Sequence, residues 1–213
     1  CIPVSPYIKD LVTNTHRVGL GFKPTFDIPR FKNQQMIITA KEPFDKQSLR
    51  PGWAPEHLRA ILRLVNEGFK LTIINATDYE YWSKYSSSTR EGSGYQTYCQ
   101  LKKLPNVRVI SSHQRQSYID EVIEESSIAI PLWNISSAHR AIPRGLAVLA
   151  FENIFDFYND SCLSILKAQE EELTEDLIYN KLKNLLTDEE FYRSFVIKLQ
   201  ETSGIVDLKT ALL

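Results

Sequence analysis

The chain has 213 residues, of which 43% are hydrophobic and 24% are charged, and its formal net charge is −1. This is the composition of an ordinary globular protein, and a charge so close to zero gives no reason to expect a nucleic-acid partner. The 3 cysteines lie far apart and form no C-x-x-C pair, so we expect neither a disulfide framework nor a zinc site. We therefore expect a reducing, cytoplasmic compartment. The chain begins at Cys1, shows no signal peptide and no membrane-spanning stretch, and is expected to be a fragment of a longer protein.

Residues 1–34 are mixed in character and contain several prolines, and we interpret them as a connector from a preceding domain. Residues 35–213 form the predicted domain, whose first strand is expected at 35–40. A helix follows, with apolar residues at the helical spacing i, i+3, i+4 and i+7: Leu58, Ile61, Leu62 and Val65. Gly68 is its expected C-terminal cap, and a second strand at 69–74 completes a βαβ unit with a right-handed crossover.

Further along the chain, we expect a flexible tip at 91–94 and a helix at 98–104. Three short aliphatic runs follow at 107–110, 128–131 and 146–151, and the first two are separated by a helical pattern at 118–123. Brief uninterrupted runs of this kind are typical of strands buried on both faces of a parallel sheet. The alternation predicts an α/β fold: a Rossmann-like parallel sheet flanked by helices, with a helical C-terminal third.

The C-terminal third contains two predicted helices. Thr174 is the expected N-cap of the first helix, and two acidic residues follow it. Residues 187–190, Thr-Asp-Glu-Glu, have the pattern of a capping box that opens the second helix. The acidic runs at 121–125 and 170–172 are interpreted as solvated faces.

Polar residues follow the predicted strands at their carboxyl ends, where open α/β sheets bind ligands. Lys41 and Lys46 follow the first strand. Their ammonium groups suit a diphosphate, although two solvated lysines fit the same spacing. Ser136 and Ser137 precede a predicted helix, where they either bind an anion or cap the helix.

Five more residues near these strand ends are candidates. His139 is a candidate for acid–base catalysis or for a hydrogen bond to a phosphate, and a structural role is the alternative. Arg140 and Arg144 lie near the start of the same helix, where cations oppose the macrodipole. Either an anionic ligand or a nearby carboxylate must therefore accompany them. Ser111 and His113 end another strand and either line a base pocket or cap the next helix.

The order of these pieces resembles the C-terminal, nucleotide-sugar-binding domain of a GT-B glycosyltransferase over about residues 24–200. Lys41 and Lys46 occupy the places of the family's Gly-Arg-x4-Lys loop, with Ala40 in place of the glycine. Residues 105–110 are similar to its Asn-Val-x-Phe strand, and 128–131 to its strand that ends in proline. Residues 140–148 echo its Glu-Ala-x-Ala-x-Gly-x-Pro-Val segment, and 185–190 look like its late helix pair.

The resemblance implies a nucleotide-sugar substrate and a set of roles. The diphosphate of the nucleotide-sugar would be held by Lys41, Lys46 and Arg140. Ser136 and Ser137 would bind the phosphate oxygens, and Ser111 and His113 would bind the base. His139 would be the catalytic residue, and no metal or other cofactor would be needed. An acceptor glycan, protein or lipid would be bound by an N-terminal domain that is not in this chain, and that half would make any peripheral membrane contact.

The chain also departs from the family. The second glutamate of the E-x7-E pair that retaining members use falls at Arg140, and no carboxylate lies between Ser126 and Phe151. Residues 136–140 are closer to the polar Ser/Thr-plus-His loop of some inverting members. Two alternatives therefore stay open: a catalytically degenerate scaffold of the same fold, and an enzyme resembling the nucleoside deoxyribosyltransferases, with Glu42 or Glu152 as its carboxylate.

Overall fold

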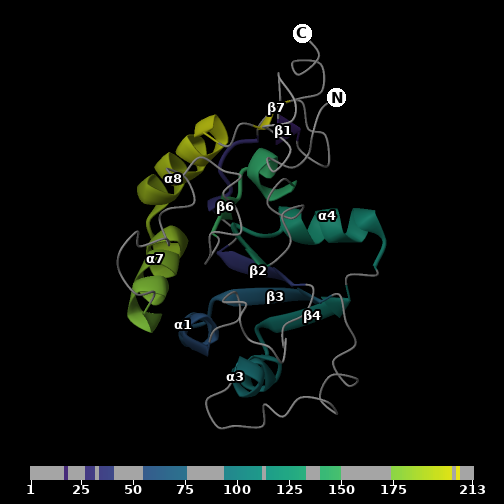
Figure 1. The fold of residues 1–213 in the computed structure, drawn as a ribbon, viewed down its shortest axis with the longest axis vertical. Coiled ribbons are helices and arrows are strands. Elements are labelled where there is room, and N and C mark those ends of the chain that lie inside the picture. Colours follow the sequence, from purple (N-terminus) through teal and green to yellow (C-terminus); the bar gives the residue numbers. More distant parts are fainter. Residues whose placement is uncertain are drawn as a thin grey trace, which may run out of the picture.

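The structure, a computed structural model, describes residues 17–18, 27–31, 34–40, 55–75, 94–111, 114–132, 140–149, 174–202 and 205–206. Its described part contains a sheet of 5 strands in the order β4-β3-β2-β5-β6, all of them parallel (Figure 1). The strands are β2 (Gln35–Ala40), β3 (Lys70–Asn75), β4 (Val107–Ser111), β5 (Ile128–Leu132) and β6 (Ala147–Val148). Two short strands, β1 (Arg17–Val18) and β7 (Ile205–Val206), pair separately and in parallel. The predicted α/β, Rossmann-like fold is confirmed.

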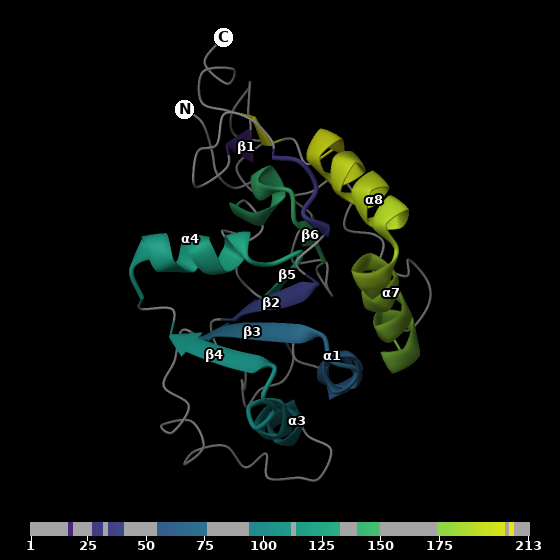
Figure 2. The same cartoon turned by 180° about the vertical axis from the view of Figure 1, so that it is seen from behind.

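The strand order determines on which face of the sheet each described helix lies. They are α1 (Pro55–Asn66), α3 (Gly94–Leu101), α4 (Gln116–Glu124), the 3-10 helix η4 (Ile142–Arg144), α7 (Glu175–Thr187) and α8 (Glu189–Thr202). The chain steps outward from β2 to β4 and then returns to β5, so right-handed crossovers put α4 on the face opposite α1 and α3. Helix α7 packs against α1, and α4 lies apart from both, across the strands (Figures 1 and 2). None of the described helices has the length and apolarity to cross a bilayer.

Strand β4 is an exception to the predicted burial on both faces, because it lies at the edge of the sheet and its Val109 is 36% exposed. The strands inside the sheet are buried on both faces, as the aliphatic runs predicted. Successive residues of a strand point to opposite faces of the sheet, yet Ile37 and Ile38 are both fully buried. The helices contribute apolar stripes to the same core, including these buried residues: Leu58, Ile61, Val65, Ile178, Leu182, Leu185 and Tyr192. In helix α1, apolar residues at the predicted helical spacing are therefore buried in the core.

Three local predictions were wrong. Helix α3 covers Gly94–Leu101 instead of the expected 98–104, and its Tyr98 and Leu101 are buried. Gly94 was expected in a flexible tip, whose other residues, 91–93, lie outside the described residues. Within the run 146–151 that was expected to be a strand, β6 covers Ala147–Val148, which pair with Ile128 and Ala129 of β5, and residues 150–151 lie outside the described residues.

The third correction concerns the capping box at 187–190. Asp188, not Thr187, caps α8, since its Oδ1 accepts a hydrogen bond from the N–H of Phe191 at 2.9 Å. Thr187 is the last residue of α7, and its hydroxyl donates to the carbonyl of Lys183. The predicted N-cap of α7 is confirmed, because the Thr174 side chain accepts from the N–H of Leu177.

The segment 27–31, expected within a connector, hydrogen-bonds to the domain. The N–H of Asp27 donates to the carbonyl of Pro143 at 2.7 Å, and that of Arg30 donates to Gly145 at 2.9 Å. The hydroxyl of Tyr192, on α8, donates to the carbonyls of Gly145 and Ser127 in the buried interior, at 3.1 and 2.7 Å. Burial raises the pKa of Tyr192 above its ordinary value. Backbone groups near Gly145 thus join the segment, the sheet and the last long helix.

Gly145 gives a test of this junction. Its φ is 76°, and a Cβ there would lie 2.3 Å from the carbonyl oxygen of Ile28. Gly68 also has a positive φ, 103°, but a Cβ there meets nothing within 4 Å. We expect Gly145→Ala to lower the free energy of unfolding by about 2–4 kcal/mol, the sum of backbone strain and overpacking. Gly68→Ala carries the strain alone and should lose about 1–2 kcal/mol.

Urea unfolding followed by circular dichroism measures both losses. Equal losses in the two variants would contradict the close approach of the 27–31 segment to Gly145.

A polar network joins α1 to α7. Lys183 donates from Nζ to a carboxylate oxygen of Glu67 at 2.9 Å, and the Tyr179 hydroxyl donates to the other oxygen. The guanidinium of Arg63 lies over the Tyr179 ring, 3.9 Å from its centre. The hydrogen bond from Tyr179, followed by that from Lys183, lowers the pKa of Glu67.

This network makes stability depend on pH in acid. A carboxyl group whose pKa is lower in the folded state stabilises the fold above its unfolded pKa of 4.5, and the stabilisation is lost as the pH falls through the folded pKa. We expect Glu67→Gln to be less stable than the parent at pH 7 and to converge with it below pH 4.5. Glu121→Gln, at an exposed position on α4, is the control for the loss of one surface carboxylate and should be as stable as the parent at pH 7. A constant offset between Glu67→Gln and the parent from pH 7 to pH 3 would contradict the lowered pKa.

Candidate functional site at the carboxyl ends of the strands

One row of residues marks the carboxyl edge of the sheet. Ala40, the last residue of β2, is the register partner of both Leu132 in β5 and Asn75 in β3. Asn75 is in turn the partner of Ser111 in β4. The strand order reverses between β2 and β5, since the chain proceeds outward from β2 on both sides. In open α/β sheets, ligands bind outside the carboxyl ends at such a switch point.

The loops with the predicted site residues leave the strands at this edge. Lys41 follows Ala40 directly in the sequence, and residues 133–139 join Leu132 to Arg140. The topology therefore starts both loops from neighbouring register positions. Most of the predicted site residues lie outside the described residues: Lys41, Lys46, His113, Ser136, Ser137 and His139. Ser111 and Arg140 are described, and the ligand roles of all eight stay predictions.

Arg140 and Arg144 both face a carboxylate of α4. Oδ1 of Asp120 lies 3.4 Å from Nη1 of Arg140 and 3.4 Å from Nη2 of Arg144. The Arg144 side chain is only 8% exposed and also lies 3.8 Å from Glu124, whereas that of Arg140 is 25% exposed. Of the two explanations for these cations, the nearby carboxylate is the one the structure shows. Part of the Arg140 side chain remains accessible to solvent and is thus available to bind an anion.

Sequence reasoning missed this cluster. Asp120 was not singled out, and Glu124 was assigned to a solvated face. The signal was the matched spacing, because Asp120 and Glu124 are four residues apart, as are Arg140 and Arg144. Arg30 adds a third guanidinium, which donates to the carbonyls of Arg144 and Glu124 and to the carboxylate of Asp27.

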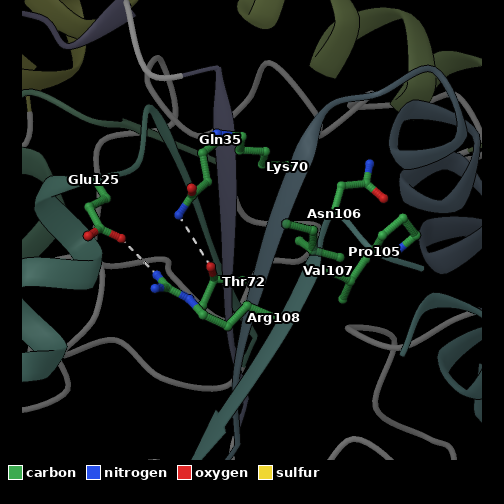
Figure 3. Close-up of a pocket in the computed structure, with 9 residues that line it drawn as sticks. Gln35, Lys70, Thr72, Pro105, Asn106, Val107, Arg108 and Glu125 are labelled. Carbon is green, nitrogen blue, oxygen red and sulfur yellow. Dashed lines mark hydrogen bonds and ion pairs between the residues drawn. The ribbon is translucent and has the colours of Figure 1, made fainter. Parts of the chain in front are cut away.

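A hollow in the described part of the structure lies at the other end of the strands (Figure 3). Its volume is about 660 Å³, and Gln35, Lys70 and Val107, the first residues of three strands, help to line it. It is therefore separate from the switch point. In the described ranges, no group of three or more histidine, cysteine, aspartate or glutamate side chains is arranged to hold a metal ion.

No family model and no curated protein matches the sequence. Solved structures match the fold. Staphylococcus aureus MnaA, solved with UDP, has a TM-score of 0.57 at 11% identity, and the match covers 84% of this chain and 42% of that one. An alpha,alpha-trehalose-phosphate synthase (UDP-forming) from Burkholderia vietnamiensis has a TM-score of 0.52 at 7% identity, covering 80% and 41%. The pneumococcal O-GlcNAc transferase GtfA, in complex with UDP and GlcNAc, has a TM-score of 0.51 at 12% identity, covering 93% and 37%.

The chain thus spans about 40% of the length of these proteins. Identities this low establish the fold alone. In its fold, this chain is a GT-B-like, Rossmann-type α/β domain, as the order of motifs in the sequence predicted.

Proposed function

We propose that this chain is the donor-binding half of a glycosyltransferase that takes a UDP-sugar. The observation that carries the proposal is the switch point between β2 and β5, where the loops with Lys41 and with residues 136–140 begin. A diphosphate needs cations or hydrogen-bond donors when it leaves water, and these loops are rich in both. All three reported matches bear UDP in their names or titles, which supports uridine as the base.

In the proposed mechanism, this chain stabilises the leaving group. Breaking the bond between the sugar and the phosphate leaves negative charge on the UDP. Lys41, Lys46 and Arg140 would neutralise that charge in place of a metal ion, and Ser136 and Ser137 would donate hydrogen bonds to the phosphate oxygens. Ser111 and His113, at the end of β4, would contact the base. His139 would transfer a proton or donate a hydrogen bond at the reacting end, and the acceptor would come from a partner domain.

A scaffold of the same fold is the second candidate, and the lack of any carboxylate between Ser126 and Phe151 favours it. UDP binding does not separate the candidates, but turnover does. The full-length protein should hydrolyse or transfer the sugar of a UDP-sugar if it is an enzyme, and should only bind it if it is a scaffold.

The first test is binding of UDP by the chain. We expect UDP at 100 times its Kd to raise the free energy of unfolding by about 2.7 kcal/mol, measured as a thermal shift. Uridine, which lacks the diphosphate, should give a much smaller shift. The double variant Lys41→Ala/Lys46→Ala should lose most of the UDP shift, whereas the matched Lys102→Ala/Lys198→Ala, at exposed positions, should keep it. No shift with UDP in the parent chain would contradict the proposal.

The second test concerns Arg140. Its side chain is a quarter exposed and only weakly held by Asp120, so Arg140→Gln should cost little stability. It should weaken UDP binding by about tenfold, the effect of losing one charge-assisted hydrogen bond. Arg193→Gln, which removes an exposed arginine that pairs with Glu189 on α8, is the control and should leave the affinity unchanged. Calorimetric titration measures both, and an unchanged affinity in Arg140→Gln would remove Arg140 from the site.

A further inference from the structure

The hollow at the amino ends of β2, β3 and β4 is polar on one face and lies away from the switch point. Nine residues line it: Gln35, Lys70, Leu71, Thr72, Pro105, Asn106, Val107, Arg108 and Glu125. We propose that it is a second binding site, for a small hydroxyl-bearing anion of the sugar-phosphate class. The proposal is independent of the proposed function, because it uses the other edge of the sheet and none of the same residues.

The strand register explains why the polar side chains gather there. Gln35 pairs with Lys70, and Thr72 pairs with Arg108, so alternation along the strands puts these four side chains on one face of the sheet. This is the face that α4 covers, and α4 ends at Glu124. Beyond that point, Arg108 reaches Glu125 across the hollow (Figure 3). Within the described part of the chain, α4 therefore leaves the amino ends of β3 and β4 partly uncovered.

The floor of the hollow is a fixed pair of neutral side chains. Gln35 is 9% exposed and Thr72 is 2% exposed. The amide nitrogen of Gln35 donates to the hydroxyl of Thr72 at 3.2 Å and to that of Ser126 at 3.3 Å, so both of its protons are used. Ser126 in turn donates to the carbonyl of Val122 at 3.0 Å.

Two hydrogen-bonding groups of this floor are still available. Among the described residues, no donor reaches Oε1 of Gln35, and no acceptor takes the hydroxyl proton of Thr72. Both side chains line the hollow, so this acceptor and this donor are available to a ligand there. A hydroxyl group fits this pair, because it both donates and accepts.

The rim adds a positive charge. Arg108 pairs with Glu125 at 2.8 Å, and their side chains are 42% and 55% exposed, so this ion pair is free to rearrange around a ligand. Lys70 is exposed and forms no ion pair within the described part of the chain. The balance of the three charged residues is therefore +1, which favours an anion. The volume of about 660 Å³ lies within the range of small-molecule clefts.

The test is a calorimetric titration of the chain with glucose 6-phosphate, glucose and inorganic phosphate. Glucose 6-phosphate should bind at least about tenfold more tightly than either fragment, since it uses the floor and the rim together. Thr72→Val, which keeps the shape but removes the hydroxyl, and Lys70→Gln should each weaken its binding by about tenfold. Lys102→Gln, at an exposed position outside the hollow, is the matched control and should bind like the parent.

Several results would overturn the proposal. They are the absence of glucose 6-phosphate binding, equal affinity for inorganic phosphate, and an unchanged affinity in Lys70→Gln. Displacement of glucose 6-phosphate by UDP would assign the binding to the carboxyl edge instead. If Thr72→Val does not fold by circular dichroism, Lys70→Gln decides alone, because its side chain is exposed. Loss of UDP binding, by contrast, bears only on the proposed function.

Discussion

The central position of β2 is the constraint from which the rest of the structure follows. It hydrogen-bonds to β3 on one side and to β5 on the other, so the chain must leave it outward, reach β4, and return across the sheet. The return changes the face on which the crossover helix lies. It also makes the carboxyl ends of β2 and β5 a switch point of the strand order, and ligands of open α/β sheets bind outside the strand ends at such a point. Among the described elements, α4 is the helix on the face of β3 and β4 that carries Thr72 and Arg108, and the polar hollow lies beyond its end.

Much of this fold could be predicted from the sequence, because the aliphatic runs that fill a doubly covered sheet have a clear local signature. The strand 35–40 and the spacing of Leu58, Ile61 and Val65 were found this way. Predictions failed where a partner elsewhere in the chain sets the boundary. Among the described residues, β6 pairs with β5 through Ala147 and Val148, and α3 begins at Gly94, earlier than its apolar pattern indicates. No local pattern contains that information.

The candidate site was predicted only in part. Placement after the strand ends follows from the order of elements, so the edge that carries the loops could be inferred. The pairing of Arg140 and Arg144 with Asp120 could not be inferred with the same ease, because it joins a helix to a segment about twenty residues later. Two arginines beside one carboxylate leave a local excess of positive charge, which Glu124 helps to balance. The polar floor formed by Gln35 and Thr72 also escaped notice, since each residue is unremarkable in its own strand.

The contact between the 27–31 segment and the domain has a consequence for sequence variation. Its hydrogen bonds to Pro143 and Gly145 are made by the main chain, and the Ile28 side chain is 79% exposed. Main-chain contacts do not depend on the side chain, so many different side chains can replace that of Ile28 without disturbing these hydrogen bonds. The residue that is restricted lies on the other side of the contact: Gly145, where a Cβ would collide with the carbonyl oxygen of Ile28. Related sequences should therefore carry many different amino acids at position 28 and almost always glycine at position 145.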